Sequence, residues 1–249
     1  MITALEVESR AVAEHLRPGR RLHEARGTVY EIGVFAGAHG SWQVPLAEVG
    51  AGNTSAGIEL DRAVAVFSPD VVLFVGIAGG VKDVSIGDVV AADAVYDYES
   101  GKETEAGLLS RIKTRTPSHR LVQHARAVSR AGLWQDGVLP QPPAAPRPRA
   151  LVKPIAAGSK VVGHDRSQTA ELLRVHCGDA VAVETEGFGF LHGAYVNAGL
   201  DALVIRGISD RLNDKGAEND EVEQPLAARH AAAFAFALLD SLAAARVGG

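Results

Sequence analysis

Short apolar runs rich in β-branched residues constrain the fold of this chain more than any other feature of its sequence. Four such runs, most of them bounded by Gly or Asp, lie at Val71–Val75, Val89–Ala92, Val181–Val183 and Ala202–Ile205. Unbroken apolar runs of this length are typical of strands that are covered on both faces. The sequence therefore predicts a sheet that is buried between other layers.

Helical patterns alternate with these runs. The segment Thr54–Phe67 carries apolar residues at helical spacing, and a glycine turn joins it to a predicted strand at Gln43–Val49. Further helices are predicted at Gln168–Val175, Gly187–Asn197 and Pro225–Ala245, the last with its proline near the first turn. Strands that alternate with helices predict a three-layer α/β/α fold around a central mixed, largely parallel twisted sheet.

The length of the chain fits one domain. With 249 residues, of which 47% are hydrophobic, it can bury a single α/β core that spans residues 1–249. One stretch, Gly137–Pro154, contains six prolines. Proline fits neither a helix interior nor a central strand, so we expect a surface loop there. A domain boundary is the alternative, but strand and helix patterns resume directly after the stretch.

Charge and cysteine usage exclude several classes of partner. The net charge of −5 offers no basic field for a phosphate backbone, so we expect no nucleic-acid partner. Cys177 is the only cysteine, which excludes an intrachain disulfide and a cysteine-based metal site and favours the reducing cytoplasm. We find no early signal-type segment and no apolar run near 18 residues, so we expect no membrane partner.

Acidic residues follow two of the predicted strands. Glu184 and Glu186 lie two residues apart, so an extended backbone would point both to one face and Thr185 to the other. Ser209 and Asp210 follow the last apolar run, at the edge where open α/β sheets bind ligands. Such groups suit a site that grips a sugar and protonates a leaving base. The alternative for the Ser-Asp pair is a cap on a following helix.

Two further segments accompany these acidic groups. Ala4-Leu5-Glu6-Val7-Glu8 stands near the start, and Gly76-Ile77-Ala78-Gly79-Gly80 follows the first predicted core strand as a glycine-rich turn. The glycines let the backbone approach a ligand, while the phosphate-binding patterns GxxxxGK[ST] and GxGxxG are absent. Taken together, the four blocks resemble the nucleoside phosphorylase/nucleosidase superfamily, most closely its methylthioadenosine/S-adenosylhomocysteine nucleosidase-like branch. They recur in the family's order and span most of the chain.

The resemblance implies roles for three acidic residues. Asp210, oriented by Ser209, would protonate or hydrogen-bond the purine at N7, and Glu186 would hold the ribose 2′ and 3′ hydroxyls. Glu8 would activate the attacking water. A carboxylate base suits hydrolysis, whereas phosphorolysis needs arginines that hold phosphate. The alternative for Glu8 is a carboxylate that only stabilises the first turn of a helix.

The resemblance also implies substrate-binding residues. The backbone at Ala78 and Gly79 would face the sugar or the nucleophile. Val161 stands where the family often has a stacking Phe, and Val162 would read the base through its backbone N–H and C=O. The Met that the family usually places between the two glutamates is replaced by Thr185, which leaves substrate choice open.

Arg206 and the histidines have less defined roles. Arg206 would pair with one of the carboxylates or lie near the sugar, and a purely structural ion pair is an equally good interpretation. His164, Asp165, His176 and His192 show no metal-ligand spacing, so we expect no metal site. No cofactor is implied.

The sequence thus predicts a purine nucleoside N-ribohydrolase that cleaves adenosine-type nucleosides, such as methylthioadenosine or S-adenosylhomocysteine, to free base and sugar. A phosphate-dependent nucleoside phosphorylase and a nucleoside-binding module without turnover are the alternatives. A homodimer is implied by the resemblance. The segment Arg211–Gln224 and the Pro-rich stretch are candidates for a lid or an interface.

Overall fold

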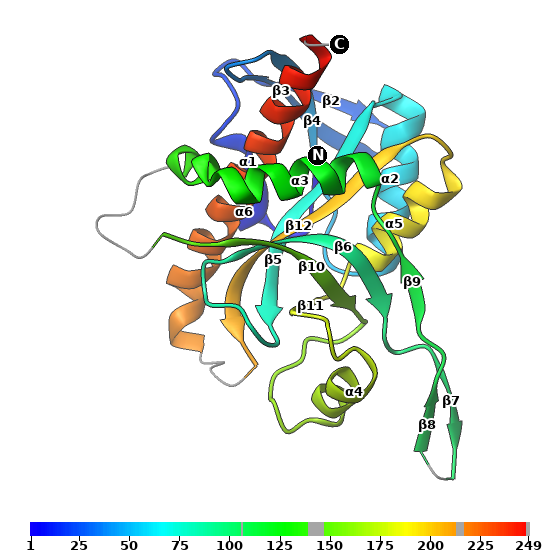
Figure 1. Ribbon diagram of the computed structural model, residues 1–249. Helices are drawn as coiled ribbons and strands as arrows, with labels where there is room; N and C mark the ends of the chain where they lie inside the picture. The colour runs from blue at the N-terminus through cyan, green and yellow to red at the C-terminus, as the bar shows by residue number, and fades with distance from the viewer. Residues whose placement is uncertain (106, 139–146, 213–216, 248–249) are drawn as a thin grey trace.

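The protein folds into three layers around one sheet (Figure 1). The structure is a computed structural model and describes residues 1–105, 107–138, 147–212 and 217–247. In these residues the sheet has ten strands: β1 (Ile2–Thr3), β2 (Arg21–Ala25), β3 (Thr28–Ala36), β4 (Ser41–Glu48), β5 (Val71–Gly80), β6 (Val89–Asp97), β9 (Lys113–Arg115), β10 (Ala150–Ala157), β11 (Ala182–Glu184) and β12 (Asp201–Arg211). The predicted α/β/α fold class is confirmed.

The sheet is mixed, and most of its central pairings are parallel. The strand order is β11-β10-β6-β12-β5-β1-β4-β3-β2, with β9 paired to β6. Strands β4, β1, β5 and β12 run parallel, as do β6, β10 and β11, and the two groups meet where β12 pairs antiparallel with β6. The carboxyl ends of β5 and β12 therefore lie side by side.

Helices cover both faces of the sheet. Alternate residues of β5 point to opposite sides: Leu73 and Val75 pack with α1 (Glu6–Ala13), α3 (His119–Ala131) and α6 (Ala217–Val247). Phe74 packs with α2 (Asn53–Phe67) and α5 (Gly187–Val196) on the other side. The short η1 (Leu133–Gly137) joins the first layer, and α4 (Gln168–His176) packs in a smaller cluster beside β10 and β11. A separate hairpin of β7 (Gly101–Thr104) and β8 (Gly107–Ser110) projects away from the body (Figure 1).

Two predictions about proline are wrong. The Pro-rich stretch is not all loop, because Pro154 lies inside β10, which pairs with β6 and β11 on its two sides. The register of β10 shifts between Lys153 and Ile155, so the proline sits where the ladder is already irregular. The part of the stretch at 139–146 lies outside the described residues. Pro225 likewise lies inside α6 rather than in its first turn.

Two strands extend further than predicted. The glycine-rich segment after Val75 continues β5 as far as Gly80, and β12 runs through Asp210 to Arg211. The helix-cap interpretation of Ser209 and Asp210 is therefore wrong. Of the segment Arg211–Gln224, the candidate for a lid or an interface, residues from 217 onward belong to α6 and residues 213–216 lie outside the description.

The segment Glu221–Arg246 of α6 is long and apolar enough to cross a membrane, which corrects the prediction that no such run exists. Within its most apolar window, however, 72% is buried inside the protein. Its Ala, Leu and Phe side chains pack against the sheet, as those of a core helix do.

Candidate active site

A cavity of about 410 Å³ opens at the carboxyl ends of the central strands. Nine of the ten sequence-predicted site residues line it, and the tenth, Arg206, lies directly behind its wall. The lining residues come from segments that are far apart in the sequence: Ala4, Leu5, Glu8, Ala51, Ile77, Ala78, Gly79, Lys160, Val161, Val162, Val183, Glu184, Thr185, Glu186, Ser209, Asp210 and Gln224.

A bulge in β12 places Asp210 at the cavity. The register of β12 against β5 shifts between Ile208 and Asp210, so that Asp210 stands opposite Gly79. A bulge of this kind re-aims a side chain. Ser209 donates its hydroxyl to Oδ1 of Asp210 at 2.9 Å, and Oδ2 lies only 3.5 Å from where a side-chain carbon on Gly79 would stand. The predicted orienting role of Ser209 therefore has a geometric basis.

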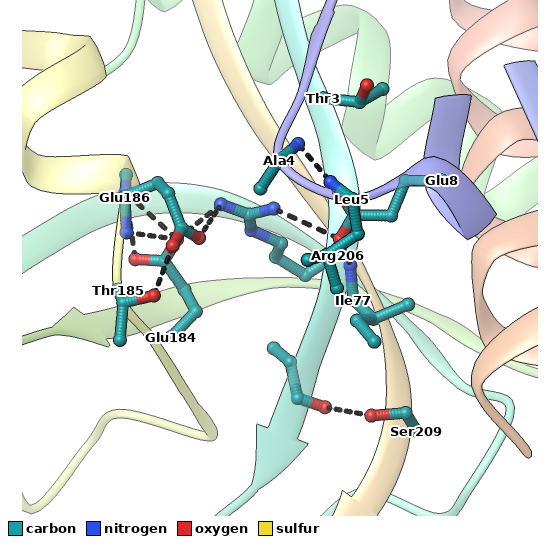
Figure 2. A network of polar contacts seen from close by, with 12 residues as sticks. Thr3, Ala4, Leu5, Glu8, Ile77, Glu184, Thr185, Glu186, Arg206 and Ser209 are labelled. Atoms are coloured by element: carbon teal, nitrogen blue, oxygen red, sulfur yellow. Dashed lines mark hydrogen bonds and ion pairs between the residues drawn. The ribbon is translucent and has the colours of Figure 1, made fainter. Parts of the chain in front are cut away.

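Arg206 is the centre of a buried charge network (Figure 2). Its Nη2 donates to Glu184 and, at 3.2 Å, to Glu186, while Nη1 lies 4.0 Å from Oε1 of Glu8. The guanidinium also stacks over the ring of Phe74, 4.4 Å from its centroid. Arg206 therefore pairs with carboxylates of the cavity, as predicted, and it does not itself line the cavity.

Glycine at position 76 makes room for this network. A side-chain carbon there would lie 2.1 Å from Nη1 of Arg206 and 2.5 Å from Oε1 of Glu8. Either contact is shorter than any real packing distance, so a larger residue would push the arginine and the glutamate apart. The glycine-rich segment therefore serves the charge network as well as the approach of the backbone to a ligand.

Glu8 is buried on the cavity wall, with 2% of its residue surface exposed. Its Oε2 accepts hydrogen bonds from the backbone N–H groups of Ala4 and Leu5, and its Oε1 accepts one from Ile77 at 2.8 Å. Burial raises the pKa of the Glu8 carboxyl, although Arg206 and the three N–H groups act in the opposite direction. Glu8 also lies in the first turn of α1, as the structural alternative predicts. The same residue lines the cavity, as the functional prediction requires.

Glu184 holds other groups in place. Besides the Arg206 guanidinium, it accepts hydrogen bonds from the backbone N–H groups of Glu186 and Gly187 at the start of α5. Burial raises the pKa of the Glu184 carboxyl, Arg206 lowers it, and the neighbouring Glu186 raises it further. The contacts of Glu184 fix the arginine and the helix end around the cavity.

The predicted alternation of this segment is wrong, because the extended backbone ends at Glu184. Glu186 is the N-cap residue of α5 with φ −126° and ψ −31°. Thr185 therefore does not face away: it lines the same cavity and donates its hydroxyl to Oε1 of Glu186. The same Oε1 accepts the backbone N–H of Gly52 at 2.9 Å, and Oε2 accepts Arg206. About one of the roughly four lone-pair positions of the carboxylate then remains for a ligand.

The segment 158–162 forms another part of the cavity wall, and hydrogen bonds hold its first two residues. The N–H of Gly158 donates to the carbonyl of Glu184, its carbonyl accepts the side chain of Asn53 at 3.0 Å, and the N–H of Ser159 donates to Glu99 at 2.6 Å. Beyond these ties, Val161 is 80% exposed and Val162 is buried. Both reach the cavity, as predicted.

The cavity is acidic. Four of its lining side chains are carboxylates, and Lys160 is the one cation among the described lining residues. That lysine pairs with Glu99 at 3.4 Å. No group of three or more His, Cys, Asp or Glu side chains able to hold a metal occurs in the part of the chain that the structure describes.

Sequence reasoning missed several residues of the site. Ala51 belongs to the glycine turn before α2, for which the sequence pattern indicates only a connection. Gln224 reaches the cavity from α6, because that helix begins earlier than its proline indicated. The glycines flanking Ala51 were the available signal, since a glycine turn at the end of a strand often faces a ligand.

Comparisons with known proteins identify the family and the fold. A family model described as "Phosphorylase superfamily" matches residues 1–244. An uncharacterized protein of Sinorhizobium fredii, y4jS, is 32% identical over an alignment of 98 residues, and the match covers 34% of this chain. The chain matches only about a quarter, 24%, of the length of that relative.

Solved structures share the fold. The 5′-methylthioadenosine/S-adenosylhomocysteine nucleosidase of Neisseria meningitidis, in complex with methylthio-immucillin-A, has a TM-score of 0.76 at 20% identity and covers 96% of this chain and 97% of its own. The nucleosidase of Colwellia psychrerythraea with adenine has a TM-score of 0.76 at 22% identity and covers 97% and 93%. The futalosine hydrolase of Helicobacter pylori has a TM-score of 0.77 at 19% identity and covers 96% and 95%.

Proposed function

The chain belongs to the phosphorylase superfamily, and from that premise we propose that it is a purine nucleoside N-ribohydrolase. Its substrates are adenosine-type nucleosides, such as 5′-methylthioadenosine and S-adenosylhomocysteine, which it cleaves to free base and ribose sugar. Solved proteins of the same fold that are named as nucleosidases of these two compounds support this choice of substrate class.

One observation carries the proposal: a single cavity gathers Glu8, Glu186 and Asp210 from α1, the start of α5 and the end of β12. Breaking an N-glycosidic bond requires a proton or hydrogen bond for the leaving base, stabilisation of the positive charge that develops on the sugar, and a nucleophile at the anomeric carbon. These three carboxylates, on different walls of one cavity, meet the three requirements.

Asp210 acts on the leaving base. It delivers a proton or a hydrogen bond to the purine N7 as the bond from the sugar to N9 breaks, so the electron pair of that bond is accepted by a neutralised base. The hydroxyl of Ser209 donates to Oδ1 and so orients the carboxylate of Asp210 at the cavity. The backbone of Val162, on the wall formed by 158–162, contacts the base.

Glu8 holds the attacking water, and Arg206 lies behind it. Nη1 of Arg206 is buried and has no hydrogen-bond partner among the described residues, and it lies 4.0 Å from Oε1 of Glu8. Glu8 lines the cavity, so a water there can donate a hydrogen bond to its carboxylate, which Arg206 supports from behind the wall. Glu8 then takes the proton of the water as its oxygen bonds to the anomeric carbon.

Glu186 and Thr185 bind the sugar hydroxyls together. Because Glu186 already accepts three hydrogen bonds, its carboxylate accepts one ribose hydroxyl. Thr185 donates its only hydroxyl proton to Glu186, so the lone pairs of Thr185 Oγ1 can accept a hydrogen bond from the second ribose hydroxyl. The threonine thus takes a polar role that a methionine at this position would not supply.

The charge of the cavity favours hydrolysis over phosphorolysis. Phosphorolysis brings a phosphate anion into the site and needs cationic donors to hold it. Here four carboxylates line the cavity, Arg206 is engaged by two of them, and the exposed Lys160 pairs with Glu99. This environment therefore favours water over phosphate as the acceptor of the sugar.

Detection of free base by chromatography tests the proposal. Methylthioadenosine, S-adenosylhomocysteine, adenosine, inosine and guanosine are each incubated with the protein, with and without phosphate. We expect release of adenine from the first two compounds at the same rate with and without phosphate. Release only with phosphate would make the protein a phosphorylase, and tight nucleoside binding without release would make it a binding module.

We also propose that the protein works as a homodimer in the cytoplasm. The family resemblance supports the dimer, and Cys177, which is free, supports a reducing compartment. Light scattering should give twice the chain mass of 26.0 kDa, and a mass of one chain would reject the dimer. Fractionation of the source cells should place the protein in the soluble fraction.

A further inference from the structure

Asn53 connects two walls of the cavity without lining it. Its Nδ2 donates to the carbonyl of Gly158 at 3.0 Å, and its Oδ1 accepts the backbone N–H of Gly189 at 2.8 Å. The first contact reaches the segment that faces the base, and the second reaches the helix that begins at Glu186. One side-chain amide therefore uses a donor and an acceptor to join two segments that are separated along the chain by α4 and β11.

We propose that Asn53 is a positioning residue that sets the distance between the base-binding segment 158–162 and the sugar-binding Glu186. The inference rests on the proposed nucleosidase function, because it assigns those two walls to the base and the sugar. It assigns a role to a residue that does not itself touch the substrate.

The sugar side of this connection is rigid. α5 approaches the start of α2 so closely that a side-chain carbon on Gly189 would lie 1.8 Å from the carbonyl oxygen of Asn53. In the same turn, the N–H of Gly52 donates to Oε1 of Glu186. Residues 52 and 53 thus hold the start of α5 and its carboxylate by two separate hydrogen bonds.

The base side depends more strongly on Asn53. Segment 158–162 is not part of a helix or strand, so it has no ladder of backbone hydrogen bonds to fix it. Gly158 is held by Glu184 through its N–H and by Asn53 through its carbonyl, and Ser159 is held by Glu99. Removing the Asn53 contact frees the carbonyl on the side that faces Glu186, so the wall can move away from the sugar site.

Asn53→Asp is the sharpest variant. It keeps an oxygen for the N–H of Gly189 but places a second oxygen against the carbonyl of Gly158, so only the base-side contact is lost. The new charge stands at the first residue of α2, where the helix dipole tolerates it. We expect KM for methylthioadenosine to rise about tenfold, as for one lost hydrogen bond, with kcat changed less than about twofold. Asn53→Ala, which adds no charge, should raise KM at least as much.

Asn197→Asp is the matched control. Asn197 lies at the other end of the same α2 and α5 pair, and its Nδ2 donates to the carbonyl of Gly193 at 3.0 Å and to Asp61. This variant should lower the melting temperature as much as Asn53→Asp or more while KM stays within about twofold of the parent. If both Asn53 variants lowered the melting temperature and left KM unchanged, or if only the charged one raised KM, the positioning role would be rejected.

Hydrogen–deuterium exchange separates this inference from the proposed function. In the absence of any substrate, Asn53→Asp should speed exchange of the Gly158 and Ser159 amides at least fivefold over the parent, and Asn197→Asp should not. This readout holds even if the parent cleaves no nucleoside, which would reject only the enzymatic proposal. Equal exchange in the parent and the Asn53 variants would overturn the positioning role whatever the activity.

Discussion

At the scale of single residues, Arg206 decides how the other charges of the cavity are arranged. It is fully buried and serves Glu184, Glu186 and Glu8 at once. Three carboxyl groups share this one guanidinium, and burial makes every unpaired charge among them costly. The family resemblance indicated each of these residues, but the sequence alone could not show that one side chain holds three of them.

Arg206→Met should therefore destabilise the protein strongly. It fills much of the same volume but leaves three buried carboxylates without their cation, and breaking a buried pair in this way costs about 3–5 kcal/mol. Denaturant unfolding should show a loss of that size. Glu6→Gln is the control, since Glu6 forms an exposed pair with Arg10 and its loss should change stability little. Equal effects of the two variants would contradict the central role of Arg206.

Asp210→Asn should reduce turnover without unfolding the protein. The amide keeps an oxygen that accepts the hydroxyl of Ser209, but it cannot supply the proton to the base. Loss of a general acid typically lowers the rate about 10²–10⁴-fold. We expect a fall of that order in kcat for methylthioadenosine with an unchanged melting temperature. Near-normal turnover would mean that another group protonates the base.

The rate should depend on pH through Glu8. Glu8 must be ionised to act as the base, and burial raises the pKa of its carboxyl above the ordinary 4.5. We therefore expect kcat/KM to fall as the pH is lowered through this raised pKa, at a pH above 4.5. Stability follows the opposite sign: a raised pKa stabilises the folded state below 4.5, and this contribution is lost as pH rises through the folded-state pKa. A pH–rate profile that stays flat down to 4.5 would exclude Glu8 as the base.

At the scale of elements, contacts with neighbouring strands and helices outweighed the tendency of proline and glycine to interrupt strands and helices. β10 accepts Pro154 because its register shifts there, and α6 accepts Pro225 in its interior. β5 keeps its glycines because β12 pairs with it as far as Gly80. The apolar runs were sufficient to predict the core strands, since burial on both faces demands them. They could not predict where each strand ends, because that depends on partners distant in sequence.

The close approach of α2 and α5 makes a prediction at this scale. Gly189→Ala would place a carbon 1.8 Å from the carbonyl oxygen of Asn53, so the helices must separate. Overpacking of this kind costs about 1–3 kcal/mol. Gly178→Ala is the control, because its nearest neighbour would lie at an ordinary 3.4 Å. Thermal melting should show a clear loss only for Gly189→Ala, and an unchanged melting temperature would mean that this helix contact yields easily.

At the scale of the whole molecule, the topology makes the site. β5 and β12 are neighbours although a long stretch of chain separates them, and their ends bring Ala78 and Asp210 to one cavity. The start of α1 adds Glu8 because β1 lies next to β5. Resemblance to the family indicated nine residues that line this cavity, since its motifs mark them. Their hydrogen bonds, and the role of Asn53, depend on contacts that no motif records.

The most direct test of the account is the identity of the sugar product. Methylthioadenosine is cleaved in ¹⁸O-labelled water that also contains phosphate, and the sugar is analysed at once by mass spectrometry. The account predicts free methylthioribose that carries ¹⁸O, formed at a rate that Glu8→Ala abolishes. A sugar 1-phosphate as the product, or no release of adenine, would contradict it.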